Sequence, residues 1–166
     1  MGNFSFPENC KLIEGLTPTV GAAAAVAGDY ISLKYAQRAW AIIHYQQGDA
    51  TSITWRIDRD STVAGALTVV SAQLHKIWSN LDTATSDLFV ERTAAINYAS
   101  GVGVTNKIII FEIDPAGLGD LAGVPYDCIR AASTTAVAAT SWVSILYVVQ
   151  PRYASAVINQ PSMIVD

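Results

Sequence analysis

The sequence predicts an all-β fold, an antiparallel β-sandwich of jelly-roll-like type, from three observations. About eight short stretches rich in β-branched and aromatic residues follow one another closely along the chain. Turn residues separate these stretches, and strands do not alternate regularly with helices. The chain has 166 residues, which is enough for one domain with a single core.

The clearest strand is Asn106 to Pro115, with the sequence NKIIIFEIDP. Its β-branched and aromatic residues favour a strand, and the proline ends it because proline has no N–H to donate. Ile109, Phe111 and Ile113 share one face of this strand, while Ile108, Ile110 and Glu112 share the other. The first half of the strand is therefore apolar on both sides. This predicts a central strand whose second face is also covered.

Several strands are predicted before this one. Tyr30–Lys34 and Ala39–Gln46 come first, and a turn at Gly48-Asp49 leads to Ser52–Asp58. In this last stretch, Ile53, Trp55 and Ile57 alternate with Ser52, Thr54, Arg56 and Asp58, which predicts a strand with one face in water. We expect Ala39–Gln46 and Ser52–Asp58 to pair as a β-hairpin.

The stretch Thr62–Leu81 fits helical and strand spacing almost equally well, because its apolar residues also recur with helical periodicity. Strand patterns resume at Leu88–Thr93 and Ala95–Tyr98. After the central strand we expect two more, at Tyr126–Ala131 and Ser141–Gln150.

The two chain ends differ from this pattern. Residues 1–28 contain prolines, glycines and a run of alanines, and they are predicted to form an extended arm, with a short strand pairing with the sheet edge as the alternative. The sandwich is expected over residues 29–151, and residues 152–166 are expected to be an extended tail. The larger apolar side chains of both ends are candidates for partner contact: Phe4, Phe6, Leu12, Ile13, Tyr153, Ile158, Met163 and Ile164.

Composition limits the function. Charged residues make up 14% of the chain, below the roughly 25% usual for soluble domains, so the surface suits coverage by other protein. The net charge of −4 and the lack of a Lys/Arg cluster argue against binding to nucleic acid or an anionic membrane. The apolar run Val20–Ala27 is too short to span a bilayer. Cys10 and Cys128 are expected to be buried thiols, with no disulfide.

No catalytic constellation is found. Asp58-Arg59-Asp60 has the Asp-x-Asp form of some metal sites, but it stands at a strand end, where such pairs usually form turns. His44 and His75 each lack a second ligand at metal-site spacing. We therefore predict a protein that is not an enzyme and has no cofactor or metal. The many aromatic residues are expected in the core and at subunit interfaces, with a sugar-binding platform as the alternative.

Spaced blocks between Gly28 and Tyr153 resemble a family of structural proteins from the head gene clusters of tailed bacteriophages. The blocks are GDYISLK from Gly28, IW at Ile77 followed by DTATSD from Asp82, NKIIIFEIDP from Asn106, DCIR from Asp127, and Tyr147–Tyr153 with its QPRY. The resemblance implies a capsid decoration or cement protein of β-sandwich type. It adds no catalytic residues, and it favours extended structure over Thr62–Leu81.

The resemblance also implies partners and a location. The expected partners are the major capsid protein and other copies of this chain, as a dimer or trimer. The protein would be made in the host cytoplasm and would sit on the outer surface of the capsid. Extended chain ends suit this role because they can add a strand to the sheet edge of a neighbouring protein. Icosahedral symmetry repeats each weak contact many times, which raises the overall avidity. The alternatives are a carbohydrate-binding adhesion module of the virion and, less favoured, a hydrolase using Asp58 and Asp60.

Overall fold

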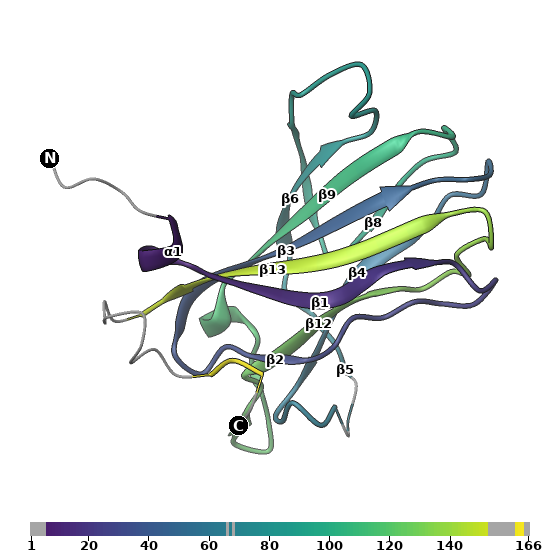
Figure 1. Cartoon of the computed structure of the whole chain (residues 1–166). Helices are drawn as coiled ribbons and strands as arrows, with labels where there is room; N and C mark the ends of the chain where they lie inside the picture. Colours follow the sequence, from purple (N-terminus) through teal and green to yellow (C-terminus); the bar gives the residue numbers. More distant parts are fainter. Residues whose placement is uncertain (1–5, 66, 68, 153–161, 165–166) are drawn as a thin grey trace, which may run out of the picture.

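The computed structural model describes residues 6–65, 67, 69–152 and 162–164. It shows two antiparallel β-sheets packed face to face (Figure 1). The predicted all-β sandwich is confirmed. One α-helical turn, α1 (Phe6–Asn9), precedes the first strand, and no helix of the described residues is long and apolar enough to cross a membrane.

The larger sheet has six strands in the order β1-β13-β3-β9-β6-β7, and the smaller one has the order β2-β12-β4-β5, with β8 also paired to β4. The strands of the larger sheet are β1 (Lys11–Val20), β3 (Ala36–Gln46), β6 (His75–Asn80), β7 (Val90–Ala95), β9 (Asn106–Ile113) and β13 (Trp142–Pro151). Those of the smaller sheet are β2 (Ile31–Ser32), β4 (Thr54–Asp60), β5 (Val69–Val70), β8 (Asn97–Ala99) and β12 (Cys128–Ser133).

The core fills the space between the two sheets. The inner face of β9 contributes Ile109, Phe111 and Ile113, which are fully buried as predicted. Tyr45 of β3 meets Trp55 of β4 edge to face, with ring centroids 5.9 Å apart, so these rings join the two layers directly. The alternation predicted for β4 holds on this side, because Ile53, Trp55 and Ile57 are buried.

Residues 11–20 do not form part of a separate arm. They are β1, an edge strand that pairs with β13 from Lys11 opposite Val149 to Val20 opposite Trp142. Gly15 is needed in this strand because a Cβ there would overlap the ring of Tyr147. The alternative of a strand on the sheet edge is therefore correct for these residues, and the sandwich begins before residue 29.

The chain after β1 crosses to the smaller sheet and follows the edge of β12. The Gly28 N–H donates to the Ala131 carbonyl at 2.9 Å, and the Ser133 N–H donates to the Val26 carbonyl at 2.7 Å. Tyr147 ties the same region to β13, since its hydroxyl accepts from the Ala131 N–H and donates to the Asp29 carbonyl. Residues that were expected to be an arm thus close one side of the sandwich.

The predicted hairpin of Ala39–Gln46 with Ser52–Asp58 is wrong. β3 lies between β13 and β9 in the larger sheet, whereas β4 lies in the smaller sheet beside β12. The turn after Gln46 therefore carries the chain between layers rather than between neighbouring strands. The ambiguous stretch Thr62–Leu81 contains no helix where described: it begins with a turn at residues 62–65, and β5 and β6 are its strands.

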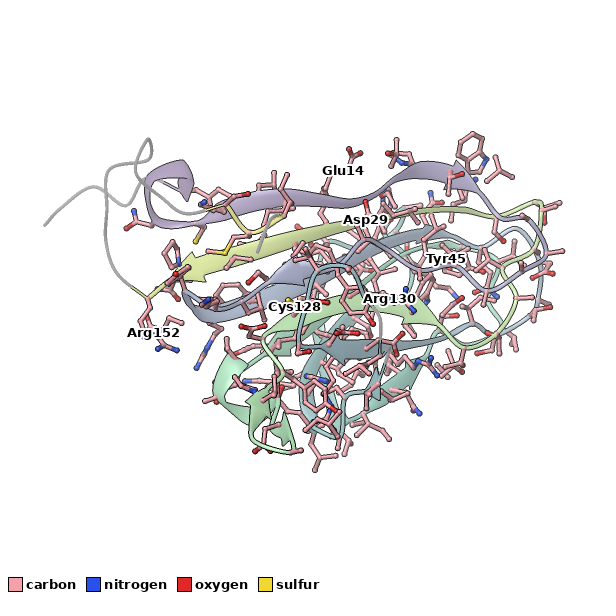
Figure 2. All side chains as sticks on the ribbon, turned by 90° about the horizontal axis from the view of Figure 1, so that it is seen from below. Glu14, Asp29, Tyr45, Cys128, Arg130 and Arg152 are labelled. Carbon is pink, nitrogen blue, oxygen red and sulfur yellow. The ribbon has the colours of Figure 1, made fainter. Side chains whose placement is uncertain are left out.

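The rest of the chain follows the expected pattern with small differences. After Pro115 come one 3₁₀ turn, η1 (Pro115–Gly117), and a two-stranded hairpin of β10 (Asp120–Leu121) and β11 (Val124–Pro125). At the C-terminal end, the Ser32 N–H donates to the Met163 carbonyl at 2.6 Å. Figure 2 shows Arg152 at the far end of β13 and Glu14 projecting from β1 away from the sandwich.

Candidate functional site

The outer face of the six-stranded sheet carries an apolar row that crosses four neighbouring strands. Leu146 of β13 lies opposite Ile42 of β3, Ile42 lies opposite Ile110 of β9, and Ile110 lies opposite Trp78 of β6. Leu146 is 37% exposed and the other three are half-buried. No described helix or strand lies over this row (Figure 1). The second face of β9 is thus apolar, as predicted, but the described chain does not cover it.

Charged side chains beside the apolar row form two pairs within the chain. Arg38 donates to Glu112 at 2.6 Å, and the Lys76 ammonium lies 3.3 Å from Glu91 and 4.8 Å from the centre of the Trp78 ring. Exposed pairs of this kind contribute little to stability. These four charges cancel, and the exposed Glu14 of β1, opposite Leu146, leaves one negative charge at the end of the apolar row.

One end of the same face is a groove with a different chemistry. It has a volume of about 360 Å³ and lies where β3 ends and β9 and β13 begin. Trp142, Gln46 and Asn106 stand in one row across the three strands, and Ser144 and His44 stand in the next row. Trp142 is 49% exposed, so about half of this residue's surface is accessible.

The predicted contact residues at the two ends differ in their exposure. Phe6, Leu12 and Ile164 are exposed, while Ile13 is half-buried against the core. Met163 is 2% exposed and belongs to the core, so its prediction as a partner contact is wrong. Phe4, Tyr153 and Ile158 lie outside the described residues.

Asp58 and Asp60 do not converge on a shared site. Asp58 is fully buried rather than in water as expected, because Arg56 and Arg130 bind its two carboxylate oxygens at 2.7 and 3.3 Å. Asp60 is also buried, and it accepts from the backbone N–H groups of Ser61, Thr62 and Leu67. Both carboxylates therefore have structural partners, and Asp60 shapes the loop after β4 as a turn former does.

The two histidines have different surroundings. His44 is exposed in the groove, whereas His75 is buried beside Phe111 with ring centroids 6.0 Å apart. Burial lowers the pKa of His75 to about 4, and the nearby backbone of Glu112 opposes this shift slightly. Neither ring nitrogen of His75 makes a well-formed hydrogen bond. His75 is therefore a neutral core residue.

Lys107, at the start of β9, is the buried cation of the inner face. Its ammonium donates to Gln47 Oε1 at 2.5 Å and to the Ser100 carbonyl at 2.8 Å, and burial lowers the pKa of Lys107. These bonds hold together the loops that follow β3 and β8. Cys10 and Cys128 are not in a disulfide, and no group of three metal-ligating side chains occurs within the described ranges.

Comparison with known proteins adds two weak structural similarities. No family model matches the chain, and no curated protein matches it. The SPBc2 prophage-derived protein YomS is 12% identical over 85% of this chain and 92% of its own, with a TM-score of 0.42. The tobacco streak virus coat protein is 8% identical over 96% of this chain and 95% of its own, with a TM-score of 0.32. These TM-scores are too low to indicate a common fold or function.

Sequence reasoning missed the apolar row and the groove. The apolar row and the groove form only because strands that are far apart in the sequence pair in a particular register. Local sequence patterns do not predict that register. One feature of the sequence does point to the apolar row: β9 has apolar residues on both faces, which indicates that its second face is covered by something.

Proposed function

We propose that the protein is a virion structural protein of a tailed bacteriophage, a decoration or cement protein that binds the outer surface of the head shell and stabilises it. The observation that carries this proposal is the uncovered apolar row of Leu146, Ile42, Ile110 and Trp78. A contiguous apolar surface of this kind marks a protein interaction site. The two ion pairs and the single carboxylate of Glu14 beside it fit a protein partner better than a nucleic acid.

The size of the face fits a specific interface. Six strands at spacings of about 4.8 Å make it roughly 24 Å wide, and eight residues at about 3.3 Å make it roughly 26 Å long. The flat footprint is therefore roughly 600 Å², and side-chain relief increases the accessible area above this value. Standard protein interfaces bury about 800 Å² on each partner. One face of this sheet is enough for such a contact.

The resemblance of the spaced sequence blocks to a family of phage head proteins supports the major capsid protein as the partner. Copies of this chain, as dimers or trimers, would then occupy repeated positions on the shell. Repetition converts a modest single contact into high avidity. No catalytic step is part of this proposal.

The test is sedimentation with empty capsids of the same phage, in parallel with binding to duplex DNA at physiological salt. We expect capsid binding and no DNA binding. Leu146→Glu should weaken capsid binding at least about tenfold, because it places a charge in the apolar row. Val70→Glu is the matched control, because Val70 on the smaller sheet is also 37% exposed.

Two outcomes would overturn the proposal. One is tight DNA binding without capsid binding. The other is equal loss of capsid binding in Leu146→Glu and Val70→Glu with both variants folded, because the outer face of the larger sheet would then have no special role.

A further inference from the structure

The groove at the far end of the outer face is lined by residues of four strands, since Pro18 of β1 joins those of β3, β9 and β13. Because alternate residues of a strand share a face, Gln46 and His44 of β3 point to the same side. Register places Trp142 on one side of Gln46 and Asn106 on the other. At about 4.8 Å between strands, the row of Trp142, Gln46 and Asn106 spans roughly 10 Å.

The polar groups of the groove are available to a ligand. The side chains of His44, Gln46, Asn106 and Ser144 form no hydrogen bond within the described part of the chain. They offer amide, imidazole and hydroxyl groups, which can both donate and accept. The indole of Trp142 provides a flat apolar surface beside them. The volume of about 360 Å³ is in the range of roughly 300–1,000 Å³ found for small-molecule sites.

Two further hollows continue the groove across the sheet. The first has the same volume and shares Gln46 and Asn106 with the groove. The second is about 520 Å³, shares Ala84 with the first, and ends at the exposed ring of Phe89. From β13 to β6 the series covers three strand spacings, roughly 14 Å. An aromatic side chain therefore stands at each end of an elongated polar trough.

The composition of this trough selects among ligand classes. No lysine or arginine lines any of the three hollows, and their charged side chains are Asp82 and Asp87, so nothing there would bind phosphate, sulfate or a nucleic acid backbone. The two carboxylates can accept hydrogen bonds from hydroxyl groups of a ligand. The amide and hydroxyl groups would be left unpaired by a purely apolar ligand, which is costly. A neutral sugar chain satisfies both requirements, because its C–H faces stack on aromatic rings and its hydroxyls pair with amides.

We propose that this trough is a binding site for a neutral oligosaccharide, with Trp142 as its stacking platform and Gln46 and Asn106 as hydrogen-bonding residues. The site lies at the end of the sandwich opposite α1 and the C-terminal end of β13 (Figure 1). It goes beyond shell binding and does not depend on it. The row of Ser144 and His44 is next to the apolar row on the same face, so the trough would stand at the rim of a shell contact centred on the apolar row.

The experiment titrates the full chain with neutral trisaccharides of glucose, mannose and N-acetylglucosamine and follows the indole N–H resonances of its four tryptophans by NMR. A sulfated heparin disaccharide is the anionic probe. We expect at least one neutral trisaccharide to shift the Trp142 resonance, the buried Trp55 to remain unchanged, and heparin to have no effect. Trp142→Ala should weaken binding at least about tenfold.

Two variants make the test specific. Asn106→Ala should also weaken binding, and it provides an independent answer if Trp142→Ala does not fold. Trp78→Phe is the control, because it changes an aromatic residue of the same face outside the trough. No trisaccharide effect at millimolar concentrations, or unchanged binding in folded Trp142→Ala and Asn106→Ala, would overturn the proposal. Capsid sedimentation of Trp142→Ala is measured in parallel and should weaken far less than that of Leu146→Glu, because Trp142 lies outside the apolar row, so the two proposals fail separately.

Discussion

The two faces of the six-stranded sheet are built from the same strands but differ in what covers them. On β9, Ile109, Phe111 and Ile113 are fully buried against the smaller sheet, whereas Ile108 and Ile110 are half-buried on the outer face. Adjacent residues of this strand therefore have different roles, because alternate side chains point to the core and to the outer face. The inner face stabilises the fold, and the described chain leaves the outer face uncovered, which is the basis of the proposed partner binding. Substitutions one residue apart should separate stability from binding.

The largest effect is expected where β1 completes the sheet. Removing residues 1–20 should prevent folding, because it exposes the edge of β13 and uncovers Tyr147, over which Gly15 packs. Removing residues 1–9 is the matched control and should leave a folded domain. Circular dichroism and gel filtration of both truncated chains provide the measurement. A folded 21–166 chain with an unchanged melting temperature would mean that β1 is a dispensable arm after all.

The second prediction compares neighbours on β9. Phe111→Ala should lower the free energy of unfolding by about 3–5 kcal/mol, because it leaves a cavity in the core. Ile110→Ala should cost clearly less, since its side chain is already partly in water. Urea titrations of the two variants measure the difference. Equal losses would contradict the assignment of the two faces.

A third prediction uses the buried histidine of the inner face. The folded-state pKa of His75 is about 4, below its ordinary value of 6.5, so the unfolded chain binds more protons between these pH values. Stability is therefore full above pH 6.5 and falls as the pH drops toward 4, by up to about 3 kcal/mol from this group. His75→Phe should lose this part of the pH dependence. The free energy of unfolding of the unchanged chain and of His75→Phe is measured between pH 7 and pH 4. If both fall equally over this range, the prediction is wrong.

The smallest effect is expected on the outer face. Leu146→Glu should change the free energy of unfolding by less than about 1 kcal/mol, because the side chain is partly exposed and can point its carboxylate into water. Thermal unfolding of this variant beside Phe111→Ala measures the contrast. A loss as large as that of Phe111→Ala would indicate that the outer face is itself part of a core.

Strands with strong local patterns were predictable, and strands defined by distant partners were not. β9 and β13 are runs of β-branched and aromatic residues, so their existence and facing follow from sequence. β1 contains Gly15 and Pro18, which suggest irregular chain, yet an edge strand tolerates both. The pairing of β3 with β9 and β13 rather than β4 follows from packing of the whole sandwich. The apolar row and the trough could not be predicted for the same reason, because both depend on which distant strands pair.

The pairing of β1 with β13 has a consequence for how the protein is made. The first strand of the sheet can take its place only after the last strand has left the ribosome, because its partner ends at Pro151. Since β3 and β4 do not form a local hairpin, the early chain also lacks an independent unit on which to build. Folding must therefore close long loops before most contacts form, which places this domain among slow, all-β folders with times of milliseconds to seconds. Apolar strands remain exposed during that interval, and the yield of soluble protein should fall steeply as the rate of synthesis increases.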